Sequence, residues 1–210
     1  MIQFRNVFKV YNNGITVLQS ISFDIQDGEF VFIYGPEGSG KTTILNLILR
    51  EELPTAGEIF INGVDLLTLP DKEIPYFRRK IGFLFHDDKL LNNRTVRENI
   101  EFVLDVTGMM REKEDRVKFV LNMFNLTGKQ YAYPDELSGG EKRKVSIARA
   151  YVVDPVIILA DEPASHLNTD AAEATINSLL EINKNGTSVV FTTSNLNVVE
   201  RVGKRIIKLA

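Results

Sequence analysis

The 210-residue sequence contains no cysteine and only two histidines, His86 and His166. The absence of cysteine excludes a disulfide scaffold and any metal centre that is built on thiolates. Two imidazoles also leave little room for a zinc enzyme, which usually takes several of its ligands from histidine and cysteine. The sequence is therefore not typical of a disulfide-stabilised or zinc-dependent protein.

Long apolar runs and an excess of positive charge are also absent. The central apolar run, Val156–Ala160, is short, and no stretch approaches the roughly 20 apolar residues of a membrane span. The first residues lack the basic region and apolar stretch of a signal peptide. Lysine and arginine number 25 against 28 acids, for a net charge of −3, which argues against a dedicated duplex-binding protein. We expect one cytoplasmic domain over residues 1–210, with no direct nucleic-acid partner.

Apolar residues recur with two different periods along the chain. Alternating or continuous apolar segments predict strands, and spacings of three and four predict helices. Strands separated by helices indicate an α/β protein with a mostly parallel sheet and helices on both faces. The predicted strands cover 2–10, 15–25, 29–34, 57–62, 156–160, 188–192 and 205–209, and the predicted helices cover 42–50 and 171–183.

The segment from about residue 95 to 136 has helical spacing and no predicted strand. We therefore expect an inserted helical subdomain over approximately 95–136. Its apolar positions are Val96, Ile100, Val103, Leu104, Val117, Val120, Leu121 and Phe124.

A glycine-rich segment lies between the predicted strand 29–34 and the predicted helix 42–50, and it matches the P-loop pattern G-x-x-x-x-G-K-[ST]. Glycines let consecutive N–H groups turn toward a phosphate, and the helix N-terminus adds partial positive charge. Lys41 would reach the β- and γ-phosphates of ATP, and Thr42 would ligate Mg²⁺. The flanking strand and helix disfavour the alternative of a flexible Gly-Ser loop. The predicted nucleotide-binding residues are Gly35, Pro36, Glu37, Gly38, Ser39, Gly40, Lys41, Thr42 and Thr43.

Two acids, Asp161 and Glu162, follow the apolar strand 156–160. A carboxylate at the end of a buried strand can hold Mg²⁺ directly or through water. The second acid could polarise a water for attack on the γ-phosphate. The alternative is a helix-capping Asp-Glu pair before Pro163. In a chain with a P-loop, the pattern favours Asp161 as a metal ligand and Glu162 as the catalytic base.

The segment Leu137-Ser138-Gly139-Gly140-Glu141 begins 24 residues before Asp161 and opens a predicted helix. A serine and two glycines at a helix N-terminus make a second anion site. With the P-loop and the two acids at these spacings, the chain resembles the ABC-type ATPases, whose signature motif this segment matches. The resemblance implies a homodimer with two sandwiched ATP molecules. Each ATP lies on the P-loop of one subunit and is capped by Ser138, Gly139 and Gly140 of the other.

The resemblance also implies an ABC-type P-loop NTPase fold with a RecA-like core, an antiparallel β subdomain and the inserted helical subdomain. ATP and Mg²⁺ are the implied ligands. Tyr11 lies where the family has an aromatic residue that stacks on adenine. The alternative for Tyr11 is a tyrosine at a strand end with an exposed hydroxyl.

Within the family the chain resembles the FtsE-type cell-division ATPases nearly end to end, most specifically over residues 73–82 and 90–100. This likeness implies an FtsX-like membrane protein as partner, docked near residues 86–98. It also implies a place at the inner face of the cell membrane and a role in controlling cell-wall hydrolysis. The ATPases of lipoprotein and macrolide exporters share much of the pattern, so an exporter subunit is an alternative. The basic run 78–80 is either a solvated face or a contact for an acidic partner.

Three positions depart from the family pattern. His86 stands where the family has a glutamine that contacts Mg²⁺ and the attacking water; a neutral imidazole can replace it in part, and neutral drift is the alternative. Asn168 replaces an aspartate in a loop that crosses the dimer interface in the family, and nearby His166 is expected to be an exposed loop residue. Ser194 occupies the place of a histidine that contacts the γ-phosphate.

The serine at position 194 has the largest predicted effect. Serine can hydrogen-bond a phosphate oxygen, but it is shorter than histidine and never cationic. The lost charge-assisted contact predicts a loss of about 1.5–3 kcal/mol of transition-state stabilisation, or roughly 10- to 150-fold in rate. We therefore expect a slow ATPase, and a nucleotide-gated switch with little hydrolysis is the alternative.

Overall fold

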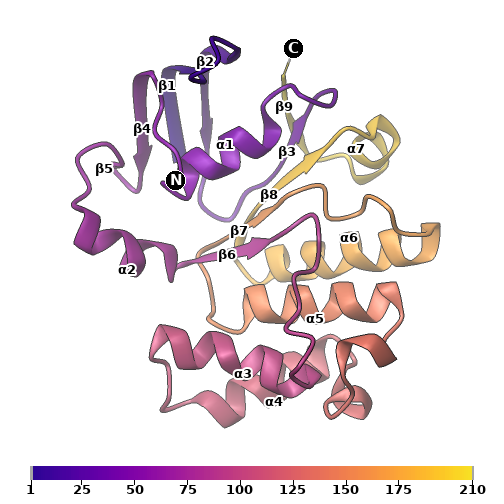
Figure 1. The fold of residues 1–210 in the computed structure, drawn as a ribbon. Helices are drawn as coiled ribbons and strands as arrows, with labels where there is room; N and C mark the ends of the chain where they lie inside the picture. Colours follow the sequence, from indigo (N-terminus) through magenta and orange to yellow (C-terminus); the bar gives the residue numbers. More distant parts are fainter. Residues whose placement is uncertain (1, 210) are drawn as a thin grey trace.

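The structure is a computed structural model that describes residues 2–209 (Figure 1). The strands are β1 (Ile2–Val10), β2 (Thr16–Ile25), β3 (Phe30–Tyr34), β4 (Ala56–Ile61), β5 (Val64–Asp65), β6 (Ile81–Leu84), β7 (Ile157–Ala160), β8 (Ser188–Thr193) and β9 (Arg205–Lys208). The helices are α1 (Lys41–Ile48), α2 (Ile74–Arg78), α3 (Val96–Thr107), α4 (Lys113–Met123), α5 (Gly139–Tyr151), α6 (Thr169–Lys184) and α7 (Leu196–Val202). Short 3₁₀ turns cover η1 (Asp71–Glu73), η2 (Thr127–Lys129) and η3 (Pro134–Glu136).

A parallel sheet with the strand order β6-β7-β8-β3-β9 positions the predicted site. Every residue of β7 and β8 is buried, as expected for strands that are covered on both faces. The P-loop follows β3, the two acids follow β7, and Ser194 follows β8. Because the carboxyl ends of parallel strands meet at one edge, these three segments converge there.

A second, antiparallel sheet with the order β2-β1-β4-β5 lies beside α1 (Figure 1). The strand and helix pattern predicted only a mostly parallel sheet, and that expectation was incomplete. The strands β1 and β2 pair antiparallel because the turn that joins them, residues 11–15, is too short to contain the crossover helix that a parallel pair needs. The ABC-type resemblance, which implies an antiparallel subdomain, agrees with the observed sheet.

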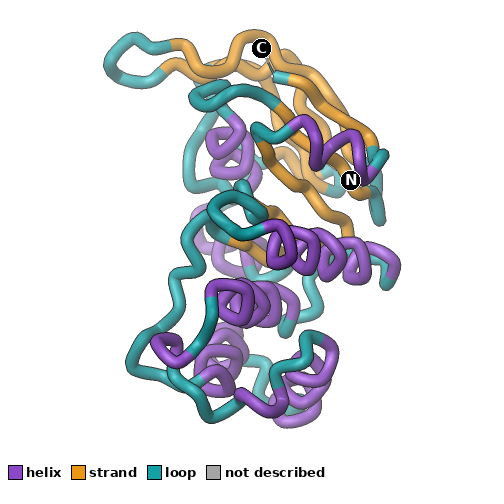
Figure 2. Tube along the Cα trace, turned by 90° about the vertical axis from the view of Figure 1, so that its right-hand side faces the viewer, coloured by secondary structure: helices purple, strands orange, loops and turns teal. Residues whose placement is uncertain are grey.

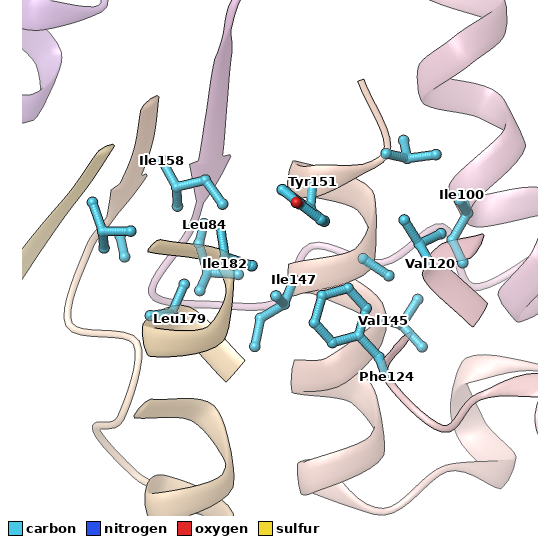
Figure 3. Close-up of a cluster of buried hydrophobic side chains, with 14 of the residues drawn as sticks. Leu84, Ile100, Val120, Phe124, Val145, Ile147, Tyr151, Ile158, Leu179 and Ile182 are labelled. Carbon is cyan, nitrogen blue, oxygen red and sulfur yellow. The ribbon is translucent and has the colours of Figure 1, made fainter. Parts of the chain in front are cut away.

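One hydrophobic cluster runs from the parallel sheet through α5 to α3 and α4 (Figure 3). Leu84 and Ile158 come from the sheet, while Leu179 and Ile182 come from α6. Figure 1 shows α6, α5 and then α3 with α4 at increasing distance from the parallel sheet, and Figure 2 shows the same helical region from the side. The helix α5 therefore joins the sheet to the helical part of the chain. The other labelled members in Figure 3 are Ile100, Val120, Phe124, Val145, Ile147 and Tyr151.

The segment 95–136 contains α3, α4, η2 and η3 and no strand, as the apolar spacing predicts. Thr95 and Glu98 form a capping box at the start of α3, and Gly108 ends the helix with φ = 78°. Within residues 2–209, no helix has both the length and the apolar character that a membrane crossing requires.

Gly82 in β6 lies directly against the backbone of α5 at Ala150, and it supplies a test of the fold. A Cβ at this position would lie closer than 3.0 Å to the backbone oxygen of Ala150, which cannot move without moving α5. We expect Gly82→Ala to lower the free energy of unfolding by about 1–3 kcal/mol. The melting temperature should fall by about 2–4 °C for each kcal/mol.

Gly128→Ala is the matched control, because nothing lies within 4 Å of a Cβ at that glycine and its φ is not positive. Urea unfolding of both variants measures the difference. Equal midpoints for the two variants would contradict the close approach of β6 and α5.

Candidate functional site

The P-loop connects β3 to α1 and lies against β2. Gly38 and Gly40 have φ of 78° and 90°, which side chains disfavour. A Cβ on Gly40 would also come closer than 3.0 Å to the side chains of Val17 and Leu18. Glycine at position 40 is therefore required both by the backbone turn and by the neighbouring strand.

Lys41, the first residue of α1, is buried, with a side chain that is 6% exposed. Its Nζ donates hydrogen bonds to the carbonyl oxygens of Gly35 and Pro36, both at 2.8 Å. It also forms an ion pair at 3.2 Å with Oε1 of Glu162. The ammonium group therefore lies inside the curve of the loop, next to the carboxylate that ends β7.

Thr42 and Asp161 are joined directly across the site. The hydroxyl of Thr42 donates to Oδ2 of Asp161 at 2.9 Å, and the hydroxyl of Thr192 in β8 donates to Oδ1 at 2.8 Å. Thr192 also accepts the backbone N–H of Glu162 at 2.9 Å. These bonds fix both acids at the end of β7. The alternative of a helix-capping pair is wrong, because the next helix, α6, begins at Thr169 and is capped by Asn168.

Glu162 has a left-handed backbone with φ = 45°. Residues that hold such a conformation without being glycine often lie at functional sites. The hydroxyl of Ser194 donates to Oε2 of Glu162 at 3.4 Å, while Lys41 contacts the other carboxylate oxygen. The predicted catalytic base, Glu162, and the departure with the largest predicted effect on hydrolysis, Ser194, are therefore neighbours.

A cavity of about 540 Å³ brings the predicted residues together. It is lined by the P-loop, the loop after β6, the loop after β7 and the end of β8. The predicted residues that are not part of this lining are Tyr11, Gly35, Pro36, Ser39, Asp161 and the signature residues 138–140. The candidate residues that line it are Glu37, Gly38, Gly40, Lys41, Thr42, Thr43, His86, Glu162 and Ser194.

Tyr11 is partly buried at the end of β1 and attached to the P-loop helix. Its hydroxyl hydrogen-bonds with Thr43 at 3.2 Å and donates to Glu52 at 3.1 Å, so the alternative of a tyrosine with an exposed hydroxyl is wrong. The ammonium group of Lys9 lies 5.0 Å from the ring centre. The ring is thus held in place beside α1, with a cation over one face.

The signature segment forms the N-terminus of α5. Ser138 caps the helix, and its backbone N–H and hydroxyl both donate to Oε2 of Glu141 at 2.8 Å. These hydrogen bonds lower the pKa of Glu141. The carboxylate of Glu141 therefore already lies at the helix end where an anion is expected. The spacing S-x-x-E is a capping-box pattern that could have indicated this arrangement.

Side chains of α5 hold the loop 85–90, an anchor that sequence reasoning missed. Arg143 donates to the carbonyl oxygens of Phe85 and His86, both at 2.8 Å. Ser146 and Arg149 donate to the carbonyl oxygens of residues 88 and 89, also at 2.8 Å. No sequence pattern predicts these bonds, because carbonyl acceptors are present at every residue.

Arg143 is the most buried member of this anchor, with an exposed fraction of 3%. It forms an ion pair at 3.2 Å with Asp88. Burial raises the pKa of Asp88, and the positive charge of Arg143 opposes that rise. Burial likewise lowers the pKa of Arg143. The loop that carries His86 is therefore held by a charge pair that depends on both partners.

The donor set of the cavity fits a nucleotide with Mg²⁺. Ser39 Oγ is buried in the P-loop and has no hydrogen-bond partner within the part of the chain that the structure describes. The oxygens of Thr42 and Asp161 are the hard ligands that Mg²⁺ takes alongside phosphate oxygens and water. A polyphosphate would supply acceptors for Lys41 and Ser39 at the same place.

Comparison with known proteins agrees with this geometry. The ABC transporter family profile matches residues 18–165, a span that includes the P-loop, the signature segment and both acids. The chain belongs to the ABC transporter family.

Relatives within the family include the cell division ATP-binding protein FtsE of Bacillus subtilis (strain 168). It is 46% identical over 210 residues, which cover 100% of this chain and 92% of the relative. FtsE of Escherichia coli (strain K12) is 38% identical over 211 residues, with coverages of 100% and 95%. FtsE of Mycobacterium tuberculosis is also 38% identical, with coverages of 100% and 92%.

Two dimeric structures have the same fold. One is a post-hydrolysis state of an ATP-binding cassette bound to ADP and Pi, with a TM-score of 0.87 and 38% identity. The other is a bacterial ABC transporter cassette, with a TM-score of 0.88 and 39% identity. Both comparisons cover 100% of this chain and 94% of the solved one.

The charge pair beneath loop 85–90 predicts the effect of Arg143→Met. Two carbonyl oxygens lose their donor and Asp88 loses its cation, so we expect the free energy of unfolding to fall by about 2–4 kcal/mol. The amides of residues 85–90 should exchange hydrogen faster than those of β3. Lys144→Met is the control, because that neighbouring side chain is only half-buried.

The pH dependence of Arg143→Met has a definite sign. Without Arg143, the folded-state pKa of Asp88 rises further above its unfolded value of about 3.9. The folded state then binds the proton more tightly, so stability falls as pH rises between these two pKa values. The loss in free energy of unfolding caused by Arg143→Met should therefore be smaller at pH 4 than at pH 7. Adding Asp88→Asn to Arg143→Met should remove this extra dependence of the unfolding free energy on pH. An unchanged pH dependence in the double variant would refute the assignment of this effect to Asp88.

Proposed function

We propose that the chain is the ATP-binding and ATP-hydrolysing subunit of an FtsE-type complex in cell division. The observation that carries the proposal is the convergence of two contact pairs at one edge of the parallel sheet. Thr42 is hydrogen-bonded to Asp161 at 2.9 Å, and Lys41 forms an ion pair with Glu162 at 3.2 Å. Lys41, Thr42 and Glu162 also line the cavity. Membership of the ABC transporter family and the similarity to FtsE proteins over the whole chain support it.

The proposed roles follow the contacts. Lys41 exchanges its loop carbonyls and Glu162 for the β- and γ-phosphate oxygens, which releases the carboxylate of Glu162. Glu162 accepts a proton from the water that attacks the γ-phosphorus. A bond forms from the water oxygen to phosphorus, and the bond from phosphorus to the ADP oxygen breaks. The products are ADP and inorganic phosphate.

Thr42 and Asp161 would hold Mg²⁺, with His86 as a third contact from the loop after β6. Bound Mg²⁺ supplies charge neutralisation for the phosphate oxygens. Thr192 and the backbone of β7 keep Asp161 oriented, so this side of the site needs little rearrangement. Tyr11 would lie against the adenine ring with the face that Lys9 leaves open.

A homodimer would complete each site. Ser138, Gly139 and Gly140 do not line the cavity of their own chain, which supports a role for them in capping a nucleotide on a second copy. Both solved neighbours are dimeric, and one of them binds ADP and Pi. ATP binding would close the dimer, and hydrolysis would reopen it.

The FtsX-like membrane partner would dock in a groove of about 350 Å³ between α2, α3 and α5. The groove is lined by apolar side chains, including Val103 and Val106, and by the guanidinium of Arg149. It adjoins loop 85–90, so a partner seated there would contact the segment that carries His86. The chain would then act at the inner face of the membrane through this partner.

A second candidate function is a nucleotide-gated switch with little hydrolysis. Ser194 contacts Glu162 at 3.4 Å, where a cationic group would be needed to stabilise transition-state charge. In such a switch the residues that bind ATP are retained, and only the rate of ATP hydrolysis is reduced.

The first test compares steady-state ATP turnover of the purified chain with that of Glu162→Gln. Removing the proton acceptor should reduce turnover by about 10²- to 10⁴-fold, while ATP binding is kept. The assay is run alone and with the membrane partner. If both proteins hydrolyse ATP at the same background rate in both settings, the switch replaces the ATPase as the function.

The second test restores the missing cation with Ser194→His. A charge-assisted contact worth about 1.5–3 kcal/mol should raise turnover by roughly 10- to 150-fold. Ser194→Ala is the matched control and should stay at or below the rate of the natural sequence. A rate for Ser194→His no higher than that of Ser194→Ala would show that position 194 does not limit hydrolysis.

A further inference from the structure

The only two histidines of the sequence lie against each other in the fold. His86 belongs to the loop after β6, and His166 belongs to the loop between β7 and α6. Their ring centres are 5.0 Å apart, with the planes at 87°. Both rings line the same cavity. Two separate loops thus bring every imidazole of the chain to one place.

The hydrogen bonds around His86 fix which ring nitrogen carries the proton. Ser165 Oγ lies 2.7 Å from the carbonyl oxygen of Glu162, which can only accept, so the hydroxyl donates its one proton there. The hydroxyl must then accept from Nδ1 of His86, 3.1 Å away. The neutral ring is protonated on Nδ1, and Nε2 keeps its lone pair. Histidines that bind metals are oriented in this way, through a hydrogen bond from the other ring nitrogen.

The backbone of His166 has φ = 57°, a left-handed conformation that is unfavourable for a residue with a side chain. The side chain is exposed on its other side. Strained backbone of this kind is kept where the surrounding structure imposes it, often at sites of function. In this loop the strain places the imidazole of His166 against that of His86.

The separation of the rings leaves room for one shared ion. Transition metals bind imidazole nitrogen at about 2.0–2.1 Å. Two rings on one tetrahedral ion would therefore have centres about 5.2 Å apart, and at a right angle about 4.5 Å. The observed 5.0 Å lies between these values.

We propose that His86 and His166 form an open two-imidazole site for a first-row transition-metal ion such as Zn²⁺, Ni²⁺ or Co²⁺. Across residues 2–209 no three His, Cys, Asp or Glu side chains gather as a closed metal cage, so water completes the coordination. Imidazole favours these ions, whereas Mg²⁺ favours oxygen ligands such as Thr42 and Asp161. The ion would tie loop 85–90 to the loop after β7. The site lies in the same cavity as the proposed nucleotide site and shares His86 with it, but Zn²⁺ binding to the two imidazoles requires neither ATP nor its hydrolysis.

The test titrates Zn²⁺ into the full-length chain without a purification tag, freed of nucleotide and of metal by EDTA that is then removed. Calorimetry gives the stoichiometry and affinity. Nitrogen-15 NMR follows the rings directly, because the chain has only two imidazole spin systems and no thiolate competitor. We expect one Zn²⁺ per chain, shifts in both rings, and no such shifts with Mg²⁺.

The variants separate the histidine pair from other sites. His86→Ala and His166→Ala should each weaken Zn²⁺ binding by more than tenfold, and Ser165→Ala, which keeps both rings, by about tenfold. Asp161→Asn, which removes a predicted Mg²⁺ ligand and keeps both imidazoles, should leave the Zn²⁺ binding isotherm unchanged. Melting temperatures in EDTA show that each variant is folded. Absence of binding, a shift in one ring only, or binding that survives His166→Ala would overturn the proposal and leave the pair as a packing contact.

Discussion

The hydrogen bond between Thr42 and Asp161 is the contact on which the arrangement of the site depends. It joins the first turn of α1 to the end of β7, two segments that are remote in the sequence. It can form only because β3 and β7 are parallel strands on either side of β8, so their carboxyl ends meet at one edge. Thr192 on the intervening strand holds the other oxygen of Asp161. The loops that carry Lys41 and Glu162 are thereby brought within ion-pair distance.

The chemistry-bearing segments could be predicted from the sequence because their spacing is tied to backbone geometry. A glycine-rich turn between a strand and a helix is typical of a phosphate-binding loop, and acids at the end of a neighbouring buried strand are typical of its metal site. The second sheet could not be predicted in the same way, since apolar spacing marks strands without giving their partners. The contacts that hold the backbone of His86 could not be predicted either. They depend on Arg143, whose place beside the loop is known only once α5 is packed against residues 85–90. The capping contact of Glu141 is different, because its S-x-x-E spacing is present in the sequence.

Two of the three departures from the family pattern, His86 and Ser194, lie in one connected group in the structure. Together with His166 they line one cavity. Ser194 and Ser165 both hydrogen-bond to Glu162, the first through its carboxylate and the second through its carbonyl oxygen. The third departure, Asn168, lies outside this lining and caps α6. A change at any of these positions therefore alters the surroundings of the others. Their effects on turnover or binding should not add independently, because neighbouring groups in one network couple.

The anchor of loop 85–90 has a consequence for how this sequence can evolve. Arg143, Ser146 and Arg149 hold the loop through its carbonyl oxygens, which every amino acid provides, and Arg143 also forms an ion pair with the side chain of Asp88. The path of the loop is thus encoded in α5 and is largely indifferent to the side chain at position 86. Residue 86 can therefore be substituted while the backbone of loop 85–90 keeps its conformation. The side chain that faces the cavity can change during evolution, and the fold around it stays the same.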